Sequence, residues 1–290
     1  SSFFAGGMIG QVRGEGVTLS GCVSQATVTG TGSAQTELFA GGLCGAVYGT
    51  EISVASCEFS GSLSPVGSLL SVGGMAGEAE GTVLFTDCGT EGGLSLTVTG
   101  SAFVGGITGR VGSGVSFLRC AFRADWAPSG CGGVLSLGGI CGRILGAGEI
   151  SVHQCVAYGS LSVGAHPDYS YSSREGDYLC VSCGVAQAAA NHPAYVGGIV
   201  GASVACGGTV SVSQCSSFLS LSATGSPVVL GGVVGLNRSD LGTALVEDCY
   251  ADGVITYPSV KNGDVAPACG GIVGVNGGCS TATLRRCFSA

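Results

Sequence analysis

A pair of adjacent glycines with a cysteine 15 to 18 residues after its first glycine recurs eight times along this chain. Successive pairs are 32 to 39 residues apart, except for one interval of 59. A repeat of this length is typical of architectures in which each unit packs on its neighbours. The pairs start at Gly6, Gly41, Gly73, Gly105, Gly138, Gly197, Gly231 and Gly270, and the cysteines are Cys22, Cys57, Cys88, Cys120, Cys155, Cys215, Cys249 and Cys287.

Two columns of apolar residues precede these cysteines. The residue five positions before the cysteine is Val17, Ile52, Val83, Val115, Ile150, Val210, Ala244 or Ala282. The residue three positions before it is Leu19, Val54, Phe85, Phe117, Val152, Val212, Val246 or Leu284. The position between the two columns is usually Ser or Thr. This alternation predicts, in every repeat, a strand with one buried face.

Two more short strands are predicted in most repeats. One runs through the Gly-Gly pair, as in residues 196–201, and the other follows the cysteine, as in residues 160–163 and 219–223. Repeats of roughly 33 residues with three short strands each predict an all-β parallel β-helix, or β-solenoid, of about eight coils in a single domain, 1–290. A β-propeller is the alternative, but its blades need four strands in about 40 to 45 residues.

Composition narrows the range of functions. Only 10% of residues are charged and the formal net charge is −8, so we expect neither nucleic acid nor anionic lipid as a partner. No apolar run reaches the roughly 20 residues of a membrane span, and no membrane insertion is expected. The 16 cysteines predict an oxidising compartment, and hence an extracellular or cell-surface location. No cluster of charged residues indicates catalysis, so no enzyme, cofactor or metal site is predicted.

Stacked coils also predict which charges meet. Immediately before the cysteine, Asp87 in the third coil is followed by Arg119 in the fourth, and Asp248 in the seventh by Arg286 in the eighth. One position earlier, Glu247 is followed by Arg285. Opposite charges on neighbouring strands attract, so we expect surface ion pairs between coils.

The segment Gly231-Gly232-Val233-Val234-Gly235, followed by Asp248-Cys249-Tyr250-Ala251-Asp252-Gly253-Val254, resembles the GLUG-motif repeats of large secreted and surface proteins. Residues 197–201 and 270–274 carry the same pattern, and weaker forms cover nearly the whole chain. The resemblance implies a β-solenoid stalk or adhesive surface module with no catalytic residues. The many cysteines and the long fifth coil depart from the family pattern.

The eight repeat cysteines are expected to stack along one corner of the solenoid. Neighbouring coils are about 4.8 Å apart, within the Cα separation of about 4.4 to 6.8 Å that a disulfide accepts. The column can therefore hold disulfides along the stack or a ladder of buried thiols, and the sequence leaves both possibilities open. Cys44 and Cys141 replace Ile9 or Val200 in the Gly-Gly segment and are expected to fill the core.

Residues 164–195 form an insertion in the fifth coil, and insertions in solenoids often form a binding loop. Tyrosines suit glycan or protein surfaces. The candidate binding residues are His166, Tyr169, Tyr171, Arg174 and Tyr178. Cys180 and Cys183 are further disulfide candidates. A zinc site formed by these two cysteines with His166 and His192 is the less favoured alternative, because a secreted protein favours disulfides.

Asn237-Arg238-Ser239 matches the N-glycosylation sequon. We predict a turn at this point, which makes Asn237 a candidate glycosylation site if the chain follows a eukaryotic secretory route.

Neither end of the sequence has the pattern of a solenoid cap, and uncapped ends expose unpaired strands. The sequence therefore predicts a structural subunit of an extracellular fibre, stalk or cell-surface appendage. Its partners would be head-to-tail copies of itself or adjoining repeats of a longer chain. The alternative is an adhesin-type module that binds glycan or protein through the 164–195 loop.

Overall fold

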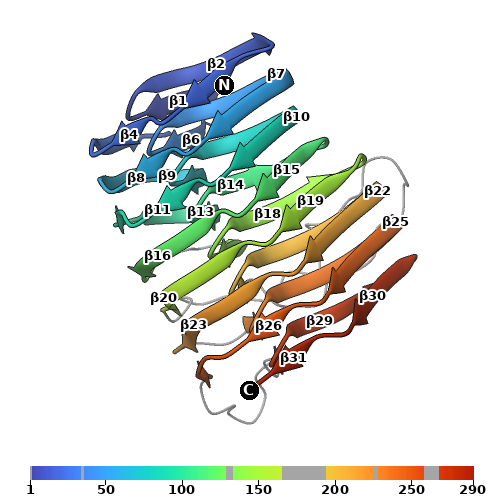
Figure 1. The fold of residues 1–290 in the computed structure, drawn as a ribbon. Helices are drawn as coiled ribbons and strands as arrows, with labels where there is room; N and C mark the ends of the chain where they lie inside the picture. Colours follow the sequence, from blue (N-terminus) through green and yellow to red (C-terminus); the bar gives the residue numbers. More distant parts are fainter. Residues whose placement is uncertain (1, 34–35, 129–132, 165–193, 225–227, 258–267) are drawn as a thin grey trace.

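The computed structural model confirms a parallel β-solenoid (Figure 1). It describes residues 2–33, 36–128, 133–164, 194–224, 228–257 and 268–290. These residues contain no helix, and every strand pair among them is parallel, as in Ser2–Gly6 beside Glu37–Gly41. From the corner at Gly6 to the corner at Gly270 the chain makes seven turns, and it then continues into an eighth coil.

The coils stack into three sheets, A, B and C. Sheet A contains β1 (Ser2–Gly6), β5 (Thr27–Thr31), β6 (Glu37–Gly41), β9 (Ser62–Gly73), β12 (Gly93–Leu94), β13 (Thr97–Gly105), β17 (Leu135–Gly138), β21 (Ala194–Gly197), β24 (Val228–Gly231) and β28 (Ala268–Gly270). Sheet B contains β2 (Ile9–Glu15), β3 (Thr18–Ser20), β7 (Cys44–Ala55), β10 (Ala76–Thr86), β14 (Thr108–Val111), β15 (Val115–Leu118), β18 (Cys141–Gly146), β19 (Ile150–His153), β22 (Val200–Ser213), β25 (Val234–Glu247), β29 (Val273–Gly278) and β30 (Thr281–Arg285). Sheet C contains β4 (Val23–Ser24), β8 (Glu58–Phe59), β11 (Gly89–Thr90), β16 (Ala121–Trp126), β20 (Val156–Val163), β23 (Ser216–Ala223), β26 (Tyr250–Ala251), β27 (Ile255–Thr256) and β31 (Phe288–Ser289).

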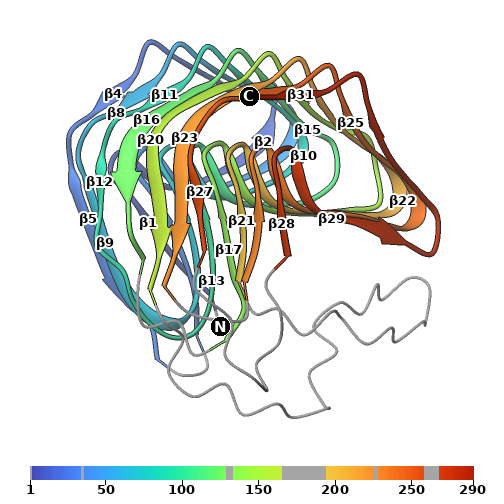
Figure 2. The same ribbon diagram turned by 90° about the horizontal axis from the view of Figure 1, so that it is seen from below.

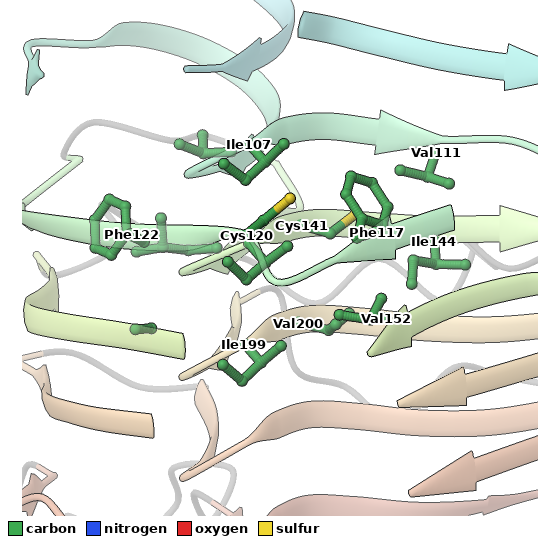
Figure 3. Packing of buried hydrophobic residues seen from close by; sticks show 14 of the residues in the cluster. Ile107, Val111, Phe117, Cys120, Phe122, Cys141, Ile144, Val152, Ile199 and Val200 are labelled. Carbon is green, nitrogen blue, oxygen red and sulfur yellow. The ribbon is translucent and has the colours of Figure 1, made fainter. Parts of the chain in front are cut away.

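The predicted apolar columns form continuous files through sheet B. Val83 pairs with Ile52 on one side and Val115 on the other. Phe85 and Phe117 also pair, and their rings stack with centroids 5.2 Å apart. All five side chains are buried. Figure 3 shows Phe117 and Val152 in this core, together with Cys141 and Val200, which pair and are buried as expected.

The Gly-Gly pair is a corner, and the single strand predicted through it is wrong. Sheet A ends at the first glycine, as at Gly197, and sheet B starts three residues later, at Val200. A Cβ on Gly197 would lie 1.9 Å from the Val200 carbonyl oxygen, so only glycine fits this bend. The amide of Gly198 donates to the carbonyl of Gly231 in the next coil at 3.1 Å, which ties successive corners together.

Sheet B forms a lobe on one side of the stack, because its chain runs outward and then returns (Figure 2). Within β25, Asn237 Nδ2 donates to the Ala244 carbonyl at 3.4 Å, so the outgoing and returning halves face each other. At the tip of the lobe, Gly242 has φ 117° and Gly278 has φ 132°, conformations that glycine adopts at little cost. The strands here are longer than predicted, and β22 and β25 contain 14 residues each.

Candidate functional site

The corner between sheets B and C carries the repeat cysteine and, before it, a residue with positive φ. This residue is glycine only in the first coil, at Gly21, where φ is 63°. In the other seven coils φ lies between 50° and 54° at Ser56, Asp87, Arg119, Gln154, Gln214, Asp248 and Arg286. Residues other than glycine rarely adopt this backbone conformation. The strand register, which repeats in every coil, holds them in it here.

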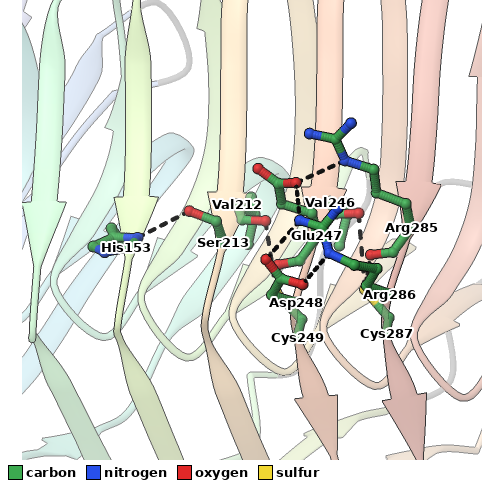
Figure 4. A network of polar contacts seen from close by, with 10 residues as sticks. All are labelled: His153, Val212, Ser213, Val246, Glu247, Asp248, Cys249, Arg285, Arg286 and Cys287. Carbon is green, nitrogen blue, oxygen red and sulfur yellow. Dashed lines mark hydrogen bonds and ion pairs between the residues drawn. The ribbon is translucent and has the colours of Figure 1, made fainter.

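The predicted ion pairs form at this corner. Arg119 Nε lies 2.7 Å from Asp87 Oδ1, and Arg286 Nε lies 2.6 Å from Asp248 Oδ1. Glu247 accepts from both Arg285, at 2.7 Å, and Arg286, at 2.8 Å (Figure 4). Hydrogen bonds from these guanidinium groups lower the pKa values of Asp87, Asp248 and Glu247 below their usual range.

Exchanging the two charges of the Asp87–Arg119 pair tests whether the attraction between these side chains stabilises the fold. Asp87→Arg alone places two guanidinium groups on adjacent coils and should lower the thermal midpoint slightly, whereas adding Arg119→Asp should restore it. Because the pKa of Asp87 is lowered in the folded state, its ionised carboxylate stabilises the fold above about pH 4. This stabilisation is lost as the pH falls through the folded-state pKa of Asp87. A double variant no more stable than Asp87→Arg at low salt would contradict the pairing.

The eight repeat cysteines are free thiols in this structure. Five of the six interior thiols lie near two carbonyl oxygens, one in the same coil and one in the preceding coil. Cys88 Sγ, for example, donates to Val54 O at 3.3 Å and Thr86 O at 3.5 Å. Burial raises the pKa of Cys57 to about 11, and a hydrogen bond with the next thiol and burial raise that of Cys88 further. The structure thus forms the thiol ladder, and disulfides along the stack stay a prediction.

We expect thiol reagents to separate three groups of described cysteines. Cys269 and Cys279 are exposed and should react fastest with Ellman's reagent. Cys22 and Cys287, half-buried at the ends of the ladder, should follow more slowly. The interior members, Cys57, Cys88, Cys120, Cys155, Cys215 and Cys249, should react only when guanidinium chloride unfolds the chain. A labelling time course read by peptide mass spectrometry measures this order, and rapid labelling of Cys120 in the native protein would contradict it.

A groove lies in the angle between sheet A and the outgoing half of sheet B. It encloses about 240 Å³, and its lining residues are Leu69, Ser101, Phe103, Arg110, Val134, Arg143 and Leu145. The Arg143 guanidinium carbon lies 4.9 Å from the centre of the Phe103 ring, and that of Arg110 lies 5.2 Å from the centre of Phe39. Cation–π stacking thus connects the two sheets across the groove.

The charges in the groove are arranged around Arg110. Arg110 Nε donates to Glu78 at 2.6 Å and its Nη1 donates to Glu37, while the Tyr48 hydroxyl also donates to Glu78. Burial raises the pKa of Glu37, an effect that Arg110 partly offsets. The Arg110 guanidinium group already binds two carboxylates. The side chains of the groove therefore primarily hold the lobe against sheet A. Sequence reasoning missed this cluster, whose only signal was the column of Phe4, Phe39 and Phe103 two residues before the glycines.

The candidate binding residues His166, Tyr169, Tyr171, Arg174 and Tyr178 lie outside the described residues, as do Cys180, Cys183 and His192. Binding through the 164–195 loop therefore stays a prediction. Near the end of that range, Tyr195 belongs to β21 and is 2% exposed, so its side chain is part of the fold.

The turn predicted at Asn237 is wrong, because the residue lies within β25 and is fully buried. Its Nδ2 atom, the atom that would carry a glycan, donates to Asn276 Oδ1 at 2.7 Å. A glycan on Asn237 would have to displace this bond and part the lobe. The sequence predicts a turn here because a strand containing Asn, Arg, Ser and Asp has the composition of a turn.

Comparison with protein-family models, curated proteins and solved structures finds no match for this chain. The resemblance to GLUG-motif repeats stays a prediction. Among the described ranges, no group of three or more His, Cys, Asp or Glu side chains is arranged to hold a metal ion. A search of the same residues finds no helix with the length and hydropathy to cross a membrane.

Proposed function

We propose that this solenoid is a structural module of an extracellular fibre, stalk or cell-surface appendage, and that its end coils pair with further coils. The observation that carries the proposal is that files buried in the middle of the stack reach solvent at both ends with apolar side chains. The added coils would belong to a second copy of the chain or to further repeats of the same polypeptide.

At the first coil, Met8 is 54% exposed, whereas Leu43 and Met75, the next members of its file, are each 1% exposed. Phe3 in β1 is also exposed and Leu19 in β3 is half-buried, whereas their partners Leu38 and Val54 are buried. These three residues come from the sheet A strand, the Gly-Gly corner and a sheet B strand. The apolar surface therefore follows the outline of a coil, which is what another coil would cover.

The last coil has the same property. Leu284 is 43% exposed while its partner Val246 is buried, and Phe288 is 63% exposed beside its partner Tyr250. The Tyr250 and Phe288 rings stack with centroids 5.8 Å apart, so the outer face of Phe288 is free to receive another ring or aliphatic side chain. Unpaired edges of parallel sheets are templates for further strands.

Electron microscopy of the purified 290-residue chain tests the proposal. We expect rods of uniform width whose lengths are multiples of one unit of about 38 Å, the height of eight coils spaced by about 4.8 Å. Introducing Met8→Lys should shorten the rods, since a buried ammonium group opposes docking. Single units that never associate at any protein concentration would overturn the proposal for copies of this chain.

A further inference from the structure

The thiol ladder ends in two half-buried members, Cys22 in the first coil and Cys287 in the last. The interior thiols have coils on both sides and are at most 2% exposed. Cys57 Sγ donates to Leu19 O in the preceding coil at 3.7 Å, and Cys287 does the same to Val246 O at 3.8 Å. Cys22 donates only within its own coil, to Ser20 O at 3.7 Å. An added coil before Cys22 would supply a carbonyl like those that Cys57 and Cys287 contact in their preceding coils.

A stack in continuous register brings these two thiols together. The file that follows the cysteine position runs without interruption from Val23 through Glu58, Gly89 and Ala121 to Phe288. If β31 of one copy pairs with β4 of the next as β26 pairs with β31, then Phe288 lies beside Val23. Cys287 then lies one coil, about 4.8 Å, from Cys22, within the Cα separation that a disulfide spans.

The other exposed cysteines of the last coil have no such neighbour. Cys269 belongs to the sheet A file that runs through Leu230, Val196 and Leu137 to Ala5. The next copy would therefore place Ala5 beside it. Cys279 follows Gly278 at the tip of the lobe, where the first coil, residues 9–15, contains no cysteine. Of the three cysteines in the last coil, only Cys287 meets a thiol across the junction.

We infer that Cys287 of one copy and Cys22 of the next form a disulfide that locks the junction between stacked modules. The inference rests on the proposed end-to-end stacking. The oxidant is a low-molecular-weight disulfide such as oxidised glutathione. The Cys22 thiolate attacks one of its sulfurs, forming a mixed disulfide and releasing one thiol. The Cys287 thiolate then attacks the Cys22 sulfur, forming the protein disulfide and releasing the second thiol. Two protein thiols are oxidised while one small disulfide is reduced to two thiols, which take up the two protons.

Oxidised glutathione added to the purified 290-residue chain, followed by a non-reducing gel, tests the lock. We expect covalent multimers in steps of 28.1 kDa that collapse to one band with reductant. Peptide mass spectrometry should find Cys22 linked to Cys287. Either Cys22→Ser or Cys287→Ser should abolish the multimers, because serine keeps the size of the side chain but cannot form the bond. Cys269→Ser and Cys279→Ser are the matched controls and should leave the multimers intact.

Mixing the two variants that cannot form multimers alone, Cys22→Ser and Cys287→Ser, gives the sharpest result. Cys22→Ser retains Cys287 and Cys287→Ser retains Cys22, so an equimolar mixture should form dimers and nothing larger. Multimers that survive in either single variant, or that map to Cys269 or Cys279, would overturn the lock. Rods in the electron microscope without covalent multimers would overturn the lock and leave stacking in place. The absence of both rods and multimers would overturn both proposals.

Discussion

Replacing Gly197 by alanine is expected to cost about 4 kcal/mol or more and to lower the thermal midpoint by about 10 °C or more. The added Cβ would meet Val200 O at 1.9 Å and the Gly235 amide nitrogen at 2.7 Å. Both atoms are backbone and belong to the corner itself and to the adjacent coil, so neither can move without breaking the register. Circular dichroism during heating measures the change.

Gly89→Ala is the matched control for this substitution. Gly89 lies in β11, its φ is not positive, and its Cβ would approach nothing closer than the Glu58 side chain at 3.9 Å. Its neighbour in the file, Ala121, already has a Cβ. We therefore expect Gly89→Ala to leave the midpoint unchanged or to raise it slightly. Equal behaviour of the two variants would show that the Gly-Gly corner is not the constraint that the geometry describes.

Trp126→Ala is expected to cost about 3 to 5 kcal/mol, as large-to-small changes in packed cores do. Trp126 is 1% exposed, and its indole packs edge-on against Phe122 with ring centroids 4.9 Å apart. Its Nε1 donates to the Gly92 carbonyl at 2.8 Å. The substitution removes the side chain that fills the core beside β16, the sheet C strand of the fourth coil. Chemical denaturation followed by circular dichroism measures the loss.

Two further variants separate volume from hydrogen bonding at this position. Trp126→Phe keeps most of the ring and should lose only about 1 to 3 kcal/mol, the cost of leaving the Gly92 carbonyl without its donor. Leu241→Ala changes a side chain that is 43% exposed and should stay within about 0.5 kcal/mol of the parent. A loss for Trp126→Ala no larger than for Leu241→Ala would mean that the indole is not part of the core.

The parallel files could be predicted from the sequence because they depend on a local pattern that repeats. Val83 and Val115, or Asp87 and Arg119, occupy equivalent positions in consecutive repeats, and stacking alone makes them neighbours. The identity of the buried columns needs only the alternation of apolar and polar residues along one strand. Neither inference requires the path that the chain takes between strands.

The corners and the lobe depend on that path. A strand that continues through Gly197-Gly198 and one that bends there have the same composition, and only the approach of Val200 O distinguishes them. Burial of Asn237 follows from the return of β25 on itself, which places its amide against Ala244 O. The ion pairs of Arg110 join residues 37, 78 and 110 from three coils and two sheets, so no single repeat contains the pattern.

Spin-label distances along one outward-facing file test the solenoid most directly. Thr18, Ser53, Leu84, Ser116, Ser151, Ser211, Leu245 and Thr283 pair in succession between the two apolar columns of sheet B. With a genetically encoded nitroxide at Thr18 and a second at Ser211, Leu245 or Thr283, five, six or seven coils separate the labels. Double electron–electron resonance should then give distances of about 24, 29 and 34 Å, an increase of about 4.8 Å per coil. Distances that do not lengthen steadily with coil number would contradict the stacked architecture.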